Sequence, residues 1–225
     1  MSTAVRFTDV VAPASMDWPG PISFDIPEGA FCVVHTTMSL STQLTRLAVG
    51  LREPTAGTVD VLGVNPGGLT RWQAQRFRRR LGVGFSEPAG LVSNLSLRMN
   101  LIVPLLYSGS AEMSRASERA DRALAECGIS AWADVRPAEL PPDVAREAVV
   151  ARAIVRDPEL LILEDPVGPL REARAGFLLS LCRQRSRTGI LTTTERESVI
   201  YDHADMILLL DENGLEISHN EVGAN

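Results

Sequence analysis

Residues 31–51, FCVVHTTMSLSTQLTRLAVGL, contain the change from strand to helix on which the fold assignment depends. The first four residues form a continuous apolar run, which is typical of a buried strand. Apolar side chains then recur at helical spacing, at Leu40, Leu44, Leu47, Ala48 and Leu51. Ser41 or Thr42 is the predicted N-cap, because a hydroxyl there can accept a hydrogen bond from the first turn of a helix.

Strand and helix patterns alternate through most of the remaining chain. Strands are predicted within 5–11, 22–27, 53–63, 81–85, 159–165 and 189–194, and an Asn-Gly hairpin within 206–218. Helices are predicted within 71–80, 113–129, 141–158 and 172–187. This alternation favours an α/β fold with a largely parallel sheet, and the helix-rich segment 88–157 is predicted to be an inserted subdomain.

Composition limits the kinds of site that the chain can carry. The net charge of −6 gives little electrostatic support for a nucleic-acid partner. All 22 basic residues are arginine, so no lysine is available as a nucleophile or phosphate clamp. The three cysteines, Cys32, Cys127 and Cys182, are far apart and are expected to be buried thiols, and the histidines have no metal-ligand spacing. No metal site is therefore expected.

Five segments, in order, resemble the framework of an ABC-transporter nucleotide-binding domain: 44–63, 81–85 with 95–105, 145–166, 189–194 and 203–217. The resemblance covers almost the whole chain. It implies one domain over 1–225, with a P-loop NTPase-like core at about 1–87 and 158–225. That core would combine a RecA-like parallel sheet with an antiparallel β subdomain. The helical subdomain would occupy about 88–157.

The phosphate-binding loop of that family, GxxGxGK[ST][ST], is altered here at its glycine and lysine positions. The three glycine positions hold His35, Met38 and Leu40, Ser41 replaces the lysine, and Thr42 stands at the magnesium-ligand position. Glycines let backbone N–H groups approach phosphate without a Cβ in the way. Losing one charge-assisted hydrogen bond costs about 1.5–3 kcal/mol. ATP binding in the family manner is therefore not expected, and this segment is predicted only to cap a strand–helix turn.

The family's other catalytic positions are altered too. The glutamine-loop position is Ser86, which is too short to bridge magnesium and water. The Walker B pair is reversed as Glu164-Asp165, and Asp165 is one methylene short for a general base. The switch histidine is Thr194.

The family signature LSGGQ is replaced by LPPDV at 140–144, which comprises Leu140, Pro141, Pro142, Asp143 and Val144. Prolines lack backbone N–H donors, and an aspartate repels phosphate. Trp18 lies near the region where the family stacks an aromatic ring on adenine, with packing at the protein surface as the alternative.

The resemblance therefore implies a non-catalytic, pseudo-ATPase subunit that supports or regulates a membrane transporter. Its expected partners are a transmembrane permease and a second ABC subunit or a second copy of itself. Because the family's paired domains share each ATP between one loop and the opposite signature, this chain would impair both sites of a pair. No catalytic residue and no ATP or Mg²⁺ cofactor is expected. The longest apolar runs are too short to span a bilayer and the first residues are too polar for a signal peptide. We expect a cytoplasmic chain held at the inner face of the cell membrane by the permease.

By family analogy, the permease contact lies between the core and the helical segment, around residues 85–107. The contact candidates are Glu87, Pro88, Leu91, Leu95, Met99 and Leu101. The alternative is that the apolar members of this set belong to the core.

Two other functions stay open. One is an active or weakly ATP-binding enzyme that uses Glu164, Asp165 and Thr42 in a rearranged site with ATP and Mg²⁺. The other is a soluble ABC-fold interaction protein that is not tied to transport. The hydroxyl-rich turn beside His35 and Arg46 also leaves a weak small-anion site open.

Overall fold

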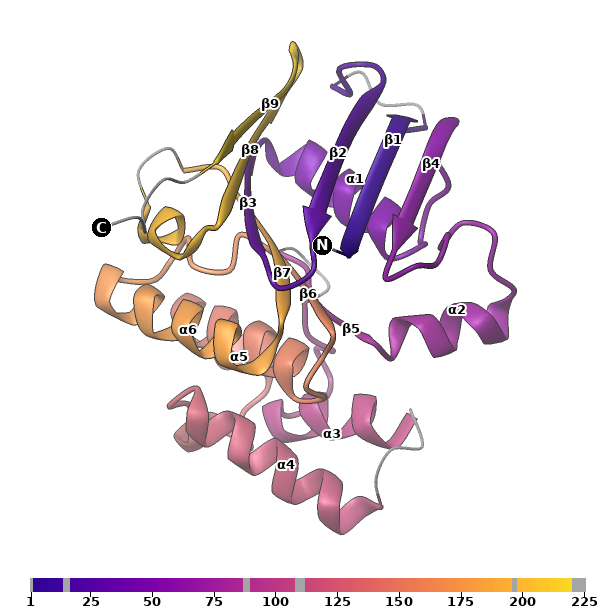
Figure 1. Cartoon of the computed structure of the whole chain (residues 1–225). Helices are drawn as coiled ribbons and strands as arrows, with labels where there is room; N and C mark the ends of the chain where they lie inside the picture. The colour runs from indigo at the N-terminus through magenta and orange to yellow at the C-terminus, as the bar shows by residue number, and fades with distance from the viewer. Residues whose placement is uncertain (1, 14–16, 87–89, 108–111, 196–197, 220–225) are drawn as a thin grey trace.

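The computed structural model describes residues 2–13, 17–86, 90–107, 112–195 and 198–219 (Figure 1). It contains two sheets. The smaller sheet is antiparallel, in the order β2–β1–β4, and consists of β1 (Thr3–Val11), β2 (Ile22–Pro27) and β4 (Ala56–Val61).

The larger sheet has six strands in the order β5–β6–β7–β3–β8–β9. Its strands are β3 (Phe31–Thr36), β5 (Leu81–Gly84), β6 (Leu160–Glu164), β7 (Thr188–Thr193), β8 (Met206–Asp211) and β9 (Gly214–His219). All neighbouring pairs are parallel except β8 and β9, which form the antiparallel hairpin predicted from Asn-Gly. The predicted combination of a largely parallel sheet and an antiparallel β part is confirmed.

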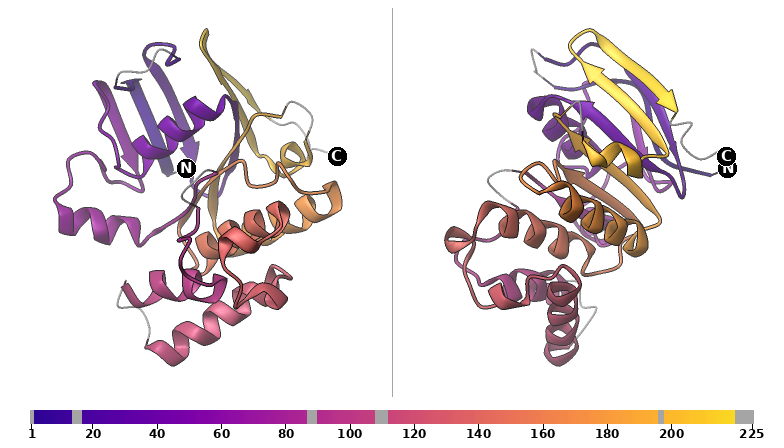
Figure 2. Two further views of the ribbon diagram at one scale, coloured as in Figure 1. Left: turned by 180° about the vertical axis from the view of Figure 1, so that it is seen from behind. Right: turned by 90° about the vertical axis from the view of Figure 1, so that its left-hand side faces the viewer.

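Helices cover both faces of the large sheet. The α-helices are α1 (Met38–Ala48), α2 (Arg71–Arg78), α3 (Leu97–Tyr107), α4 (Met113–Glu126), α5 (Pro142–Ile154) and α6 (Glu172–Arg185). Three short 3₁₀ helices are η1 (Ser130–Trp132), η2 (Pro137–Glu139) and η3 (Val199–His203). Helix α1 lies between the two sheets, and α5 and α6 lie on the opposite face of the large sheet, with α3 and α4 farther out (Figures 1 and 2).

Alternate residues of β3 belong to two separate apolar cores, because successive side chains of a strand point to opposite faces. Cys32 and Val34 pack with α1 and the small sheet, whereas Phe31 and Val33 pack with the helices on the other face. Both faces are covered, which explains the continuous apolar run in the sequence.

The segment 88–157 does not form a single layer. Helices α3 and α4 pack on each other away from the sheets (Figure 2). Helix α5 instead packs on β5, where a Cβ at Gly84 would lie 2.9 Å from Cγ1 of Val149. The division into a core at 1–87 and 158–225 and a helical subdomain at 88–157 stays a prediction. Within the described residues, no helix is both long and apolar enough to cross a bilayer.

Candidate functional site

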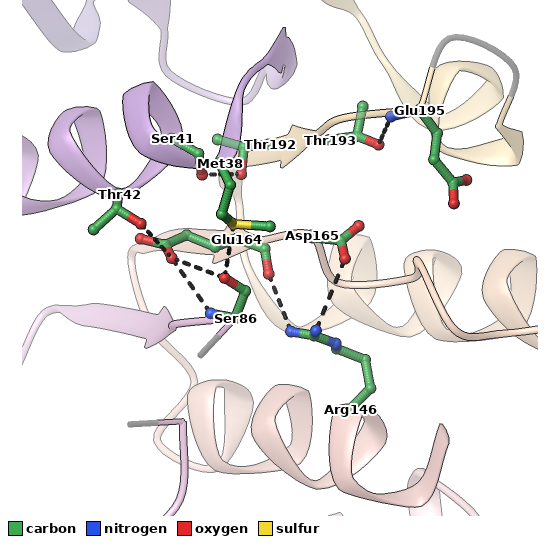
Figure 3. A network of polar contacts seen from close by, with 10 residues as sticks. All are labelled: Met38, Ser41, Thr42, Ser86, Arg146, Glu164, Asp165, Thr192, Thr193 and Glu195. Atoms are coloured by element: carbon green, nitrogen blue, oxygen red, sulfur yellow. Dashed lines mark hydrogen bonds and ion pairs between the residues drawn. The ribbon is translucent and has the colours of Figure 1, made fainter. Parts of the chain in front are cut away.

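The carboxyl ends of the parallel strands bring most of the predicted site residues to one edge of the sheet. Strand β3 leads into Met38, β5 leads to Ser86, and β6 ends at Glu164. In open α/β sheets, ligands bind at this edge. Figure 3 shows the polar network that fills this part of the structure.

Helix α1 begins four residues earlier than the sequence analysis predicted. The N-cap is Thr37, whose Oγ1 accepts a hydrogen bond from the N–H of Leu40 at 3.3 Å. The prediction of Ser41 or Thr42 as N-cap is wrong. Met38 and Leu40 are good helix formers, so nothing in the chain opposes an early start. Only Thr37 separates β3 from α1. Met38, Leu40 and Ser41, which the sequence analysis aligned with the family's phosphate loop, therefore lie in the first turn of a helix.

The side chains at two of the key loop positions face the protein interior. Leu40 is fully buried in the same core as Val34 and Leu44. Ser41 is 2% exposed, and its Oγ lies 2.6 Å from Oγ1 of Thr192 on β7 (Figure 3). Ser41 thus ties α1 to the sheet instead of facing a bound anion.

Glu164 is buried, and one of its carboxylate oxygens accepts hydrogen bonds from neighbouring residues. Its Oε2 accepts hydrogen bonds from Oγ1 of Thr42, from the N–H of Ser86 and from Oγ of Ser86, each at 3.3 Å (Figure 3). The Ser86 hydroxyl also lies 3.0 Å from the sulfur of Met38. In the part of the chain that the structure describes, Oε1 of Glu164 has no hydrogen-bond partner. Three predicted site residues are thereby linked to one another through one carboxylate oxygen.

Asp165 pairs with Arg146 of α5, a residue that the sequence analysis missed. Nη2 of Arg146 lies 3.8 Å from Oδ2 of Asp165, and Nη1 donates to the carbonyl oxygen of Glu164 at 3.4 Å (Figure 3). Both side chains are largely buried, at 12% and 17% exposure. Gly168 leaves room for the carboxylate, since a Cβ there would lie 2.4 Å from Oδ2 of Asp165. Nothing in the sequence distinguishes Arg146 from Arg152 and Arg156 of the same predicted helix.

The segment 140–144, which the sequence analysis aligned with the family signature, leads into α5. Pro141 is the N-cap and Pro142 is the first helical residue, so neither offers an N–H to a ligand. Asp143 is exposed, and its Oδ1 lies 2.9 Å from the N–H of Val144, whose side chain is buried. Leu140 precedes the helix and is partly buried against the core. This segment serves to begin a helix.

Thr194 and His35 lie beside a different space from Glu164. They line a cavity of about 770 Å³, together with Met38, Tyr201 and residues at the end of β8. The Tyr201 hydroxyl lies 3.1 Å from Nδ1 of His35 and donates to the carbonyl of Glu195 at 2.8 Å. Burial and the nearby Glu195 raise the pKa of Tyr201. The sequence analysis placed Thr194 and Glu164 in one site, but among the described residues no hydrogen bond or ion pair joins the two side chains.

The structure also bears on the roles predicted for Trp18, Arg46 and Leu101. Trp18 is buried in the core and its Nε1 donates to the carbonyl of Val10 at 3.0 Å, so it neither stacks on adenine nor packs at the surface. Arg46 lies in the last turn of α1, at the opposite end from His35, which removes the anion site proposed for that pair. Leu101 is fully buried, and its assignment as a permease contact is wrong.

The remaining contact candidates have different positions. Leu91, Leu95 and Met99 are partly buried, and Leu91 and Met99 pack against the core. Glu87 and Pro88 lie outside the described residues.

Comparisons with known proteins agree with the fold. The family model "ABC transporter" matches residues 41–168. The lipoprotein-releasing system ATP-binding protein LolD of Chromohalobacter salexigens is 30% identical, over 81% of this chain and 78% of that protein. The methionine import ATP-binding protein MetN 2 of Paraburkholderia xenovorans is 27% identical, over 84% of this chain but 50% of that protein. The chain thus spans about half the length of that relative.

Solved structures give the same result. The dimeric ATP-binding cassette MJ0796 in a post-hydrolysis state, bound to ADP and Pi, superimposes with a TM-score of 0.83 at 18% identity, covering 96% of this chain and 98% of that one. CbiO1 of Clostridium perfringens gives a TM-score of 0.79 at 19% identity, covering 98% of this chain and 89% of that one. The two sheets and their helices form the α/β fold of ABC ATPases. The chain belongs to the ABC transporter family.

Proposed function

We propose that this chain is a non-catalytic subunit of an ABC transporter, which supports or regulates the transporter complex through permease and partner-subunit contacts without hydrolysing ATP. The observation that carries the proposal is the start of α1 at Met38, one residue after β3. A phosphate loop needs several consecutive backbone N–H groups that curl around the anion. Here the same residues are wound into the first turn of a helix, whose N–H of Leu40 is already capped by Thr37.

The position of the missing lysine supports the same conclusion. Ser41 carries no charge, and its hydroxyl is already bonded to Thr192 in the interior. One charge-assisted hydrogen bond to phosphate is worth about 1.5–3 kcal/mol, which corresponds to roughly ten- to a hundred-fold in affinity. The fully buried Leu40 has no freedom to move aside, because it is part of the core.

The acidic pair does not fit the metal and base chemistry of the family either. Oε2 of Glu164 is occupied by the donors from Thr42 and Ser86, which leaves only its buried Oε1 for a cation among the described contacts. To accept a proton from water, Asp165 would have to leave Arg146. ATP and Mg²⁺ therefore do not fit these residues, and we derive no hydrolytic step through them.

The proposed partners are a transmembrane permease and a second ABC subunit, or a second copy of this chain. The support comes from relatives: CbiO1 is described as part of the ABC transporter complex cbiONQ, and MJ0796 was solved as a dimer. A permease would hold the chain at the inner face of the cell membrane. Leu91, Leu95 and Met99 stay in the proposed contact region.

Titration calorimetry of the purified chain with ATP, with and without Mg²⁺ and up to millimolar concentration, tests the proposal. MJ0796 under the same conditions serves as the positive control. We expect heat of binding for MJ0796 and none for this chain. Micromolar, Mg²⁺-dependent binding would overturn the proposal, as would phosphate release that Glu164→Gln abolishes.

A further inference from the structure

The outer side of α2 combines positive charge with a large aromatic side chain. Trp72, Arg76 and Arg79 recur at helical spacing and are exposed, and we call this stripe the α2 face. Ala74 and Phe77, on the opposite side of the helix, are buried. The helix lies at the edge of the molecule, beside β5 and apart from α5 and α6 (Figures 1 and 2). The α2 face is therefore turned away from the rest of the chain.

The helix that carries this face is firmly held. Thr70 and Gln73 form a capping box at its start, in which the N–H of Thr70 donates to Oε1 of Gln73 at 2.9 Å. Phe77 is 4% exposed and belongs to the core that contains α1. Arg78 donates to two backbone carbonyls just after α1, at 3.0 and 2.6 Å. The α2 face is thus organised before any partner arrives, which reduces the entropy cost of binding.

No nearby acidic residue in the sequence balances this charge. The stretch 61–86 contains five arginines and no aspartate or glutamate. Within the described part of the chain, neither Arg76 nor Arg79 takes part in an ion pair, although eight other arginines do. The gathering is local, because the whole chain has a net charge of −6. The α2 face is therefore a cationic surface on an acidic protein, and it attracts an anionic partner.

The two most exposed aromatic side chains lie at this part of the molecule. Trp72 is 67% exposed, and Tyr107 at the end of α3 is 72% exposed. Tyr107 and Arg71 line the same cavity. The guanidinium carbon of Arg76 lies 5.8 Å from the centre of the Trp72 ring. Tryptophan and tyrosine gather at membrane–water interfaces, where both the apolar ring and its polar group are accommodated.

A membrane surface fits this shape better than a nucleic acid does. From Trp72 to Arg79 the stripe is about 10 Å long, on one helix. Single-stranded nucleic acids bind in grooves that follow their backbone over several nucleotides. The α2 face instead lies on the outside of a peripheral helix (Figure 1). A layer of anionic headgroups needs no concave partner and attracts every arginine that comes near it.

We propose that the α2 face binds the headgroup layer of an anionic membrane, with Trp72 at the interface and Arg76 and Arg79 on lipid phosphates. The chain makes this lipid contact directly, without the permease. Only the nearness of a membrane rests on the proposed function, which places the chain beside one.

Co-sedimentation of the full chain with lipid vesicles tests the charge preference. The probes are vesicles of phosphatidylcholine alone and vesicles that contain phosphatidylcholine and phosphatidylglycerol in equal parts. We expect the chain to bind the anionic vesicles at least about tenfold more tightly. We also expect this affinity to fall as salt is raised, because screening weakens the attraction between exposed charges. Equal affinities for the two kinds of vesicle would overturn the proposal.

The double variant Arg76→Gln with Arg79→Gln removes two exposed charges. Glutamine is a good helix former, so the fold should persist. We expect binding to the anionic vesicles to weaken at least about tenfold. Arg115→Gln with Arg122→Gln makes the same change at exposed positions of α4 and should leave binding unaltered. Equal effects of the two double variants would overturn the proposal. So would tighter binding of a single-stranded oligonucleotide than of the anionic vesicles.

Tryptophan fluorescence locates the contact. Trp72 is exposed, whereas Trp18 is buried and Trp132 is partly buried against the core. We expect the anionic vesicles to shift the emission to shorter wavelength as the Trp72 ring leaves water. Trp72→Phe should abolish the shift and Trp132→Phe should keep it. A shift that survives Trp72→Phe would contradict the assignment of the α2 face.

The ATP titration, repeated on these variants, separates the two proposals. Neither Arg76 nor Arg79 belongs to the Glu164 network. Micromolar ATP binding together with vesicle binding that depends on Arg76 and Arg79 would refute the non-catalytic role and keep the lipid contact. No ATP binding together with equal affinities for both kinds of vesicle would have the reverse meaning.

Discussion

Leu40→Ala tests whether the first turn of α1 is a packed part of the core or a loop that could open around phosphate. Leu40 stands at the third glycine position of the family's loop and is fully buried. It shares its core with Val34 of β3 and with Leu44 one turn along the helix. Removing three carbon atoms therefore leaves a cavity between the helix and the sheet.

The expected cost follows from the burial of the side chain. Leu→Ala at fully buried sites costs about 2–5 kcal/mol, depending on how far the surroundings collapse. Collapse is restricted here because β3 is paired on both sides, with β7 and β8. Alanine is only slightly better than leucine as a helix former, so propensity offsets little of the loss. We therefore expect about 3 kcal/mol, which is a fall in Tm of roughly 6–12 °C for a domain of this size.

Urea denaturation followed by circular dichroism measures the free energy of unfolding. The matched control is Leu51→Ala, the same change at a residue that is 53% exposed just after α1. We expect that control to cost less than about 1 kcal/mol. If Leu40→Ala cost no more than Leu51→Ala, the first turn would not be packed. The main support for a non-catalytic role would then be lost.

Two further predictions concern buried charge and buried thiols. Arg146→Gln should lower the free energy of unfolding by about 1–3 kcal/mol, because it leaves the largely buried Asp165 without its cation. Adding Asp165→Asn should cost less than the sum of the single changes in urea melts, and strict additivity would contradict the pairing. Burial raises the pKa of Cys32, Cys127 and Cys182, in the case of Cys127 to about 12, so none should react with a thiol reagent at pH 8 before urea unfolds the chain. The pKa values of these thiols in the folded chain exceed the ordinary value of 9.0. Their contribution to the free energy of unfolding should therefore be complete below pH 9 and fall as the pH rises further. A series of Tm measurements at increasing pH checks this.

The order of strands and helices follows from local patterns in the sequence. Buried parallel strands leave continuous apolar runs, as in β3 and β6. The Asn213-Gly214 pair predicted the β8–β9 hairpin, in which Asp211 lies opposite Gly214. These features depend on residues close together in the chain, so periodicity and turn chemistry were sufficient to predict them.

The start of α1 required tertiary information. Thr37, Ser41 and Thr42 all have hydroxyls that can cap a helix, and capping rules do not distinguish among them. Thr37 is the N-cap because the side chains of Leu40 and Ser41 are buried against the sheet, which places both residues inside the helix. Similarly, the sequence around Trp18 did not indicate that its indole N–H would donate a hydrogen bond to the carbonyl of Val10 in the core. Packing overrides local preference at such places.

The replaced positions of the site form partnerships with one another. Ser41 bonds to Thr192, and Thr42 and Ser86 share Oε2 of Glu164. Several of these residues stand where the family holds the groups that contact nucleotide, metal or water. Ser41, Thr42, Ser86 and Oε2 of Glu164 thus have hydrogen-bond partners within the chain, as buried polar groups generally do, whereas Oε1 of Glu164 has none among the described residues.

Under the proposed non-catalytic role, these contacts would also oppose a single substitution that introduced the family's lysine. A lysine at position 41 would place an ammonium where the present side chain is 2% exposed, beside Thr192 and away from solvent. Burying an unpaired charge costs several kcal/mol, so one reversion would destabilise the chain before it improved phosphate binding. Recovery requires the α1 turn, position 41 and the Glu164 network to change together. Under the proposed non-catalytic role, the same coupling would let the framework persist without a nucleotide site, because these polar residues bond to the fold that carries them.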